Sequence, residues 1–183
     1  MDTEQAIELL KKYAPSEEIF ENVYNHSHRV MQYGVDLAKS AKGVDVDFVA
    51  TACLLHDIGR FYCPPGSGRG ILHGIEGARI LREENLTEHA EVAERHIGVG
   101  ITREDIMEQG LSLPMKDYTP RTKEEMIVAY ADNLDSREVS SERDVEERFC
   151  RELGERYREK VRRFHEQVHE LLDKAREASG SSS

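Results

Sequence analysis

Hydrophobic residues along this chain recur at intervals of three and four, the spacing of one face of an α-helix. No segment shows the sustained alternation of apolar and polar residues that a half-buried strand requires. We therefore predict an all-α, single-domain helical bundle with about seven or eight helices. The predicted helices cover residues 3–13, 16–40, 45–58, 74–84, 87–98, 102–109, 122–138 and 141–178.

Two stretches between the predicted helices are irregular and contain glycine and proline, namely 62–70 and 110–120. Both are candidate rims of an active site. The last residues, 179–183, are serine and glycine only, and we expect them to form a disordered tail. The predicted domain accordingly spans 1–178, with its core motifs in 20–138 and a long amphipathic C-terminal helix over 141–178 that could cover the bundle or a second subunit of a homodimer.

Charge and composition exclude several classes of protein. The formal charge of −11 would repel phosphate backbones, so no nucleic acid partner is expected. No apolar run approaches the roughly 18 residues of a membrane span, so no membrane partner is expected either. The N-terminus is acidic, unlike a secretory signal, and Cys53, Cys63 and Cys150 form no CxxC pair. These features predict a cytoplasmic protein with reduced thiols.

Two histidines of the second predicted helix lie on different faces. With Val30 as the reference, Ile19 and Leu37 fall within about 20° of it, and His26 falls about 40° away, inside the apolar face. His28 falls about 160° away and is predicted to be a surface residue. His26 is therefore either a core histidine or a metal ligand.

Two aspartates occur where a carboxylate is costly to bury. The third predicted helix is nearly all apolar and ends in His56 and Asp57, after which Gly59 lets the chain turn away. Asp132 directly follows the apolar run 126–131, with no adjacent lysine or arginine. A divalent cation shared with an imidazole would neutralise such carboxylates, so the pattern favours a metal site.

These motifs resemble the HD superfamily of metal-dependent phosphohydrolases. The resemblance is carried by His-Ser-His-Arg-Val at 26–30, Leu-His-Asp-Ile-Gly-Arg at 55–60 and Ala-Asp at 131–132, in the order of the family. It implies that the metal ligands are His26, His56, Asp57 and Asp132.

Two further motifs resemble the additional histidines of the binuclear HD branch. They are His-Gly-Ile-Glu-Gly-Ala at 73–78 and Glu-Arg-His-Ile-Gly at 94–98. The resemblance implies His73 and His96 as ligands and Asp57 as the carboxylate that bridges two metals. The branch includes enzymes that cleave dinucleoside tetraphosphates and cyclic dinucleotides, but the Gly-Tyr-Pro signature of the cyclic-dinucleotide group is absent here.

Some histidines have competing interpretations. His89 lies on nearly the same face as His96, and periodicity alone does not separate the two, whereas the family pattern selects His96. His165, Glu166 and His169 match the HExxH signature of zinc peptidases. Their angles from the apolar stripe of the last predicted helix, about 80° and more, place all three in solvent and disfavour a peptidase.

The predicted ligands define the expected chemistry. Imidazole and carboxylate donors without thiolate suit two divalent transition-metal ions, iron or manganese first, with cobalt, nickel and zinc also compatible. Such a pair would share a hydroxide and hydrolyse a phosphoester or phosphoanhydride of a small phosphorylated substrate, namely a nucleotide or dinucleoside polyphosphate. Asp57 and Arg60 are the predicted catalytic residues, and Arg60, Arg69 and Lys116 the predicted substrate-binding residues.

Two alternatives share the same ligands. Some HD-fold proteins hold a mixed-valent di-iron centre in this six-ligand pattern and act as oxygenases. The chain could also keep its metals only for stability, as a non-catalytic sensor. Activity across different metals separates these classes, because redox chemistry requires iron whereas hydrolysis does not.

Overall fold

The computed structural model describes residues 1–135 and 141–180, and within them the chain is helical without a strand, as predicted. None of the described helices is long and apolar enough to cross a membrane. The nine α-helices of the described residues are α1 (Thr3–Tyr13), α2 (Glu17–Lys39), α3 (Val46–Leu55), α4 (His73–Glu83), α5 (Thr87–Arg95), α6 (Arg103–Gln109), α7 (Lys123–Leu134), α8 (Glu142–Leu153) and α9 (Tyr157–Gly180). Two short 3-10 helices, η1 (Ile58–Phe61) and η2 (Gly70–Leu72), lie between α3 and α4.

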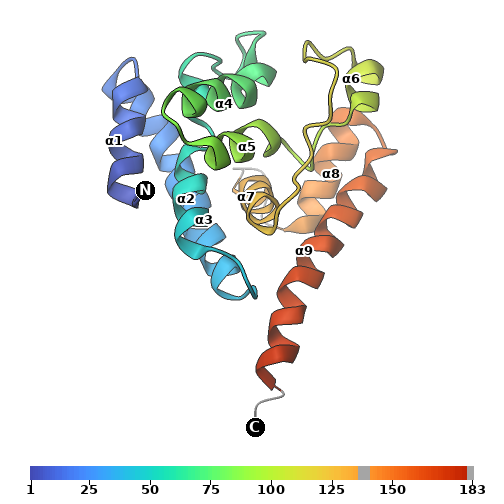
Figure 1. Ribbon diagram of the computed structural model, residues 1–183. Coiled ribbons are helices and arrows are strands. Elements are labelled where there is room, and N and C mark those ends of the chain that lie inside the picture. The colour runs from blue at the N-terminus through green and yellow to red at the C-terminus, as the bar shows by residue number, and fades with distance from the viewer. Residues whose placement is uncertain (136–140, 181–183) are drawn as a thin grey trace.

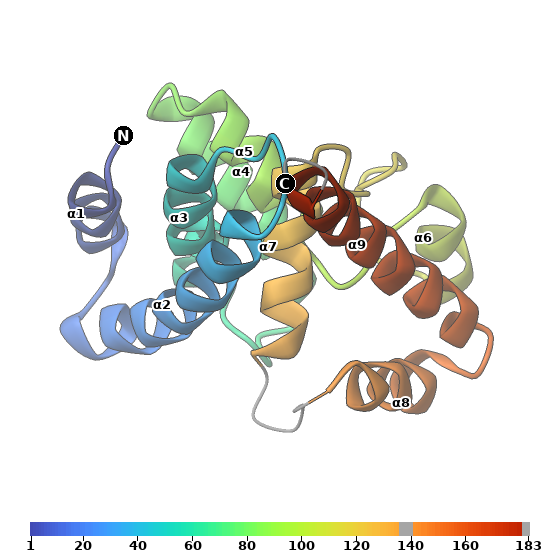
Figure 2. The same cartoon turned by 90° about the horizontal axis from the view of Figure 1, so that it is seen from below.

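Helix α7 occupies the centre of the molecule (Figure 1). It packs against α2, α3 and α5 on one side and against α8 and α9 on the other (Figure 2). Its apolar residues Ile127, Val128 and Ala131 are fully buried, which explains why its sequence is apolar on almost every face. Asp132 follows them and is thereby carried into the interior.

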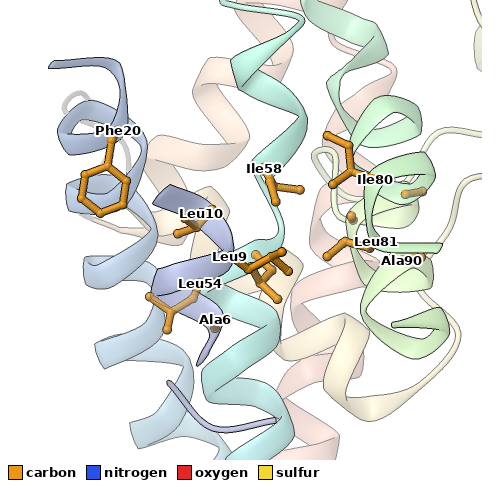
Figure 3. Packing of buried hydrophobic residues seen from close by; sticks show 12 residues of the cluster. Ala6, Leu9, Leu10, Phe20, Leu54, Ile58, Ile80, Leu81 and Ala90 are labelled. Carbon is orange, nitrogen blue, oxygen red and sulfur yellow. The ribbon is translucent and has the colours of Figure 1, made fainter. Parts of the chain in front are cut away.

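A hydrophobic cluster anchors the segment that follows α3. Leu10 of α1, Leu54 of α3, and Ile80 and Leu81 of α4 are fully buried in this cluster (Figure 3). Ile58, the residue after Asp57, is fully buried in the same cluster. Each such side chain contributes about 1.5–3 kcal/mol of burial free energy, so the backbone that carries Asp57 is held firmly.

The buried face of α2 differs from the prediction. Val30 is buried as predicted, but Ile19 is 41% exposed, and Ser27 and Gly34 are buried on the other side of Val30. A Cβ at Gly34 would lie 2.8 Å from the sulfur of Cys53, so α3 approaches α2 closely at these small residues. A pattern that counts only apolar side chains misses such a contact, and the buried face is rotated by roughly 50° from the predicted one. His26 therefore lies at the flank of the buried face.

The predicted long C-terminal helix over 141–178 is two helices. Gly154 has φ +103, a conformation that favours glycine, and α8 ends there before α9 begins at Tyr157. The two helices pack against each other as a hairpin. Helix α9 continues to Gly180, so the predicted tail begins too early, and 181–183 lie outside the described residues.

The remaining helix boundaries agree with the prediction to within a few residues. The helix predicted over 45–58 ends at Leu55, a turn follows, and η1 begins at Ile58. The helix predicted over 87–98 ends at Arg95. The predicted end of the seventh helix at residue 138 lies outside the described residues.

Asp105 joins α6 to the C-terminal hairpin. Its carboxylate accepts hydrogen bonds from the Tyr157 hydroxyl at 2.9 Å, from the Thr102 backbone N–H at 2.7 Å and from the Lys160 ammonium. Burial alone would raise the pKa of Asp105, but the hydrogen bonds from Lys160 and Thr102 outweigh burial and lower the pKa to about 2.

We predict that Asp105→Asn lowers the free energy of unfolding by about 1–3 kcal/mol at pH 7. Because the pKa of Asp105 falls from 3.8 to about 2 on folding, its contribution is complete above about pH 4 and is lost as the pH falls through about 2. The free energies of unfolding of wild type and variant, measured with urea, should therefore differ less at about pH 3 than at pH 7. The exposed Asp36→Asn is the control, and an equal difference at both pH values would contradict this assignment.

Candidate metal centre

Six side chains that the sequence singles out converge in one place. They form three overlapping groups of possible metal ligands, and within each group the donor atoms lie within 4.8 Å of one another. The six are His26 of α2, His56 and Asp57 after α3, His73 at the start of α4, His96 after α5, and Asp132 of α7.

Three of the histidines are oriented by the backbone. In His56, His73 and His96, the Nδ1 atom contacts the carbonyl oxygen of the residue three positions earlier. The distances are 2.6, 2.6 and 2.8 Å, respectively. A carbonyl only accepts, so Nδ1 carries the proton and Nε2 is left facing the centre of the site. This is the arrangement that prepares imidazoles for metal binding.

His26 is oriented by a carboxylate that the sequence analysis missed. Its Nδ1 lies 2.9 Å from Oδ2 of Asp135, and Asp135 also accepts two hydrogen bonds from the Arg29 guanidinium at 2.9 and 3.0 Å. The other ring nitrogen, Nε2, lies 3.0 Å from Oδ1 of Asp132. His26 and Asp135 are 109 residues apart in the chain, so no local motif indicates their contact.

The carboxylate of Asp57 lies between two pairs of imidazoles. Oδ1 is 3.2 Å from Nε2 of His73 and 3.5 Å from Nε2 of His96. Oδ2 is 3.7 Å from Nε2 of His26 and 3.9 Å from Nε2 of His56. Each oxygen thus faces a different pair of imidazoles.

The unsatisfied groups of this site fit divalent cations. Nε2 of His56 is buried without a hydrogen-bond partner. Burial lowers the pKa of His73 to about 3, so its ring is neutral and Nε2 is a lone pair, which faces Nε2 of His96 at 3.1 Å. A cation between such nitrogens would satisfy all of them, and four imidazoles with two carboxylates form a donor set for divalent transition metals.

The two carboxylates remain ionised in this environment. Burial alone would raise the pKa of Asp57, but the neighbouring imidazoles, His56 first, and the Arg60 guanidinium hold it well below its usual range. The pKa of Asp132 is also lowered, because its contacts with His26 at 3.0 Å and with His56 at 3.5 Å outweigh burial. The site therefore keeps the negative charge that attracts cations.

Arg60 and Gly59 shape the turn after the His-Asp pair. Nε of Arg60 donates to Asp57 at 3.2 Å, and Nη1 lies 3.4 Å from the carbonyl of Gly70. A Cβ at Gly59 would lie only 1.9 Å from the carbonyl oxygen of His73, so the glycine is required by close packing of η1 on α4. This contact brings Asp57 against His73.

The centre opens into a cavity of about 690 Å³. His26, Asp57, His73, His96 and Asp132 line it, together with side chains of α8 and α9. The irregular stretches contribute as predicted to its lining, with Pro65 from the first and Leu111 from the second.

Two of the predicted substrate-binding residues do not line this cavity. Arg69 is exposed and its guanidinium lies 3.8 Å from Glu76. Lys116 pairs with Glu94 at 2.8 Å and lines a separate surface depression. The sequence indicated the loops of both residues but not the glutamates with which their side chains pair. Of the three predicted residues, only Arg60 lines the cavity.

The competing histidines lie elsewhere. Nε2 of His89 lies 2.9 Å from the Thr51 hydroxyl, outside the converging groups. His165 is buried beside the Tyr130 ring, contrary to the prediction that it is solvated, and His169 pairs with Glu142 at 2.8 Å. Among the described residues, neither histidine of the HExxH motif belongs to a group of three possible metal ligands.

Comparison with known proteins agrees with this site. The chain matches the HD domain family over residues 23–137, so it belongs to that family. It is 43% identical to an uncharacterized protein of Methanocaldococcus jannaschii, over 86% of this chain and 89% of the relative.

Two longer relatives carry the name tRNA (cytidine(56)-2'-O)-methyltransferase. The protein of Thermoplasma volcanium is 40% identical over 73% of this chain, and that of Picrophilus torridus is 35% identical over 91%. The matches span only 36% and 46% of the length of those proteins.

Solved structures share the fold. The HD domain of the L. monocytogenes phosphodiesterase PgpH superposes with a TM-score of 0.58 at 17% identity, covering 96% of this chain and 97% of that one. The same domain in complex with cyclic-di-AMP gives a TM-score of 0.58 at 18% identity and covers 97% of each chain.

We predict that His26→Ala removes bound metal, whereas His28→Ala leaves metal content unchanged. The reason is that His26 faces Asp57 and Asp132, while the half-buried ring of His28 packs 5.5 Å from that of Tyr24. Elemental analysis of both variants after reconstitution with Mn²⁺ measures the difference. Equal losses in the two variants would mean that the assignment of His26 is wrong.

We predict that Asp135→Asn weakens metal binding by about 10- to 100-fold without unfolding the protein, because His26 loses the carboxylate that fixes its ring. Competition with a fluorescent chelator measures the affinity, and Asp36→Asn on the exposed surface of α2 is the matched control. An unchanged affinity in Asp135→Asn would show that the ring orientation of His26 does not depend on this contact.

Proposed function

We propose that this protein is a metal-dependent phosphohydrolase that acts on a small phosphorylated substrate, a nucleotide in the first instance. The observation that carries the proposal is the position of Asp57, whose two oxygens face two different pairs of imidazoles. Membership of the HD domain family supports it. The cavity beside the site is of the size that accepts a small molecule.

Two divalent ions are proposed, held by His26, His56, Asp57 and Asp132 on one side and by Asp57, His73 and His96 on the other. Iron or manganese is preferred, with cobalt, nickel or zinc also compatible, because the imidazole-rich donor set is less suited to magnesium. Divalent ions bound there would lower the pKa of a water molecule towards neutrality and polarise a phosphoryl oxygen.

The protein contributes fixed positions and charge. The backbone carbonyls and Asp135 hold the imidazoles before any substrate arrives, so little reorganisation is needed during the reaction. Arg60 lines the cavity beside Asp57 and can donate to an oxygen of the transferred phosphoryl group. Water then adds to phosphorus, the bond to the leaving oxygen breaks, and that oxygen departs with a proton.

A substrate screen tests the proposal. Mononucleotides, dinucleoside polyphosphates, cyclic dinucleotides and phosphomonoesters are incubated with protein loaded with Mn²⁺, Co²⁺ or Fe²⁺, and released phosphate or nucleotide is measured. Hydrolysis with Mn²⁺ or Co²⁺ is the expected result. Turnover that requires both iron and dioxygen would instead favour the oxygenase, and no turnover of any substrate would favour the non-catalytic sensor.

We predict that Asp57→Asn lowers the hydrolytic rate by about 100-fold or more, because the amide offers one oxygen instead of two and lacks the negative charge. The fold should survive, since a neutral amide at this buried position needs no cation. Rates are compared with circular dichroism and metal content of the same preparations. A folded Asp57→Asn protein with full metal content and near-normal turnover would contradict the proposed mechanism.

A further inference from the structure

One wall of the cavity, formed by residues of α8 and α9, lies outside the segment that matches the family. That match ends at residue 137, whereas Arg148, Phe149 and Leu153 of α8 and Tyr157 of α9 all line the cavity. Figure 2 shows the α8–α9 hairpin beside α7, which carries Asp132. The family segment thus provides the reacting groups, and the C-terminal hairpin provides the surface that a bound substrate would meet next.

Arg148 is a cation of this wall that pairs with no carboxylate among the described residues. Its guanidinium donates to Oδ1 of Asn133 at 3.0 Å, directly beside Asp132 in the chain. The other two basic side chains of the cavity are already paired, Arg60 with Asp57 and Lys160 with Asp105. A neutral amide does not cancel the charge of Arg148, so this residue remains available to an anion.

Phe149 is held in place beside Arg148. Its ring lies against Gly98, where a Cβ would be 3.0 Å from the ring carbon Cζ, and the φ of +59 also favours glycine there. The guanidinium of Arg148 lies 5.4 Å from the centre of the same ring. Val99 and Leu153 extend the apolar surface around Phe149 along the cavity. A flat, apolar group is the ligand that such a surface accepts.

The charges of the cavity limit how many phosphates it accepts. Its lining includes five carboxylates and three basic side chains. Two divalent ions at the metal centre would leave a positive surplus of about two charges, which matches one phosphate monoester. A tetraphosphate would carry about twice the negative charge of a phosphate monoester or more, which exceeds the positive surplus of this lining.

We infer that Arg148 and Phe149 form the substrate-recognition subsite, and that the substrate is a monophosphate ester with an aromatic group, such as a nucleoside monophosphate. Arg148 binds an oxygen of the phosphate beside the metal centre, and Phe149 stacks with the aromatic group. This inference rests on the proposed function, whose substrate it narrows, and it disfavours the dinucleoside polyphosphates that the sequence suggests.

The experiment compares three substrates and one inert ligand. The substrates are adenosine 5′-monophosphate, ribose 5-phosphate, which lacks the base, and diadenosine tetraphosphate. The inert ligand is the phosphonate analogue of adenosine 5′-monophosphate in which a methylene group replaces the ester oxygen. Its dissociation constant is measured by calorimetry with Mn²⁺-loaded protein, so binding is observed independently of turnover.

Arg148→Gln should weaken binding of the analogue by about 10- to 100-fold, the effect of losing a hydrogen bond between charged groups, and should raise KM for both monophosphates. Phe149→Leu should raise KM for adenosine 5′-monophosphate by about tenfold and leave that for ribose 5-phosphate unchanged. Arg143→Gln, an exposed arginine on the same helix, is the control and should bind as wild type does. Metal content and melting temperature should stay constant in all three variants.

Each result distinguishes the inference from the proposed function. Analogue binding that depends on Arg148 without turnover of any ester would support the subsite and contradict the hydrolase. Turnover of adenosine 5′-monophosphate together with analogue binding unchanged in Arg148→Gln would overturn the subsite and leave the hydrolase intact. A preference for diadenosine tetraphosphate would also overturn the inference. If Arg148→Gln or Phe149→Leu is poorly folded, Arg148→Lys or Phe149→Tyr replaces it. Full loss of the preference for adenosine 5′-monophosphate over ribose 5-phosphate in Phe149→Tyr would contradict stacking.

Discussion

Four imidazoles and two ionised carboxylates share one largely buried space, and the structure around them is built to hold these groups together. A buried carboxylate without a compensating charge is costly, and here the pKa of both aspartates is lowered although burial opposes it. The surrounding elements remove the freedom of each group. Backbone carbonyls fix three of the rings, Asp135 fixes the fourth, and the absence of a side chain at Gly59 lets Asp57 approach His73. A metal pair would complete an arrangement that the fold already prepares.

Much of this centre was predictable because two of its carboxylates occur in segments that are otherwise apolar. Asp57 and Asp132 stand at the ends of apolar runs, where a carboxylate needs a partner, and the resemblance of the histidine motifs to the HD superfamily then implies the other candidate ligands. The helices were predictable for a related reason, since apolar periodicity follows directly from packing one face of a helix on a core.

Other features depend on contacts between distant parts of the chain. Asp135 reaches His26 across 109 residues, and Lys116 pairs with Glu94 instead of reaching the cavity. The break at Gly154 was not predicted because the apolar stripe continues through it in the sequence, although the φ of +103 separates α8 from α9. His165 is buried beside the Tyr130 ring of α7, and helical angles along one helix do not include that contact.

The break at Gly154 also connects the fold to function. Because α8 ends at Gly154 and α9 packs back against it, Arg148 and Phe149 of α8 and Tyr157 of α9 line the same cavity as Asp132. Asp105 accepts hydrogen bonds from Tyr157 and Lys160 and so ties the start of α9 to α6. The side chains of the proposed metal centre and those of the proposed recognition subsite therefore come from different parts of the chain and meet only through tertiary packing.

The central claim is that Asp57 bridges two metal sites, and counting the ions tests it most directly. Native mass spectrometry of protein reconstituted with Mn²⁺ should show two ions per chain in the wild type and no more than one in His96→Ala, because that variant disrupts the pair formed with His73. A single ion in the wild type, with the same content in His96→Ala, would contradict the account.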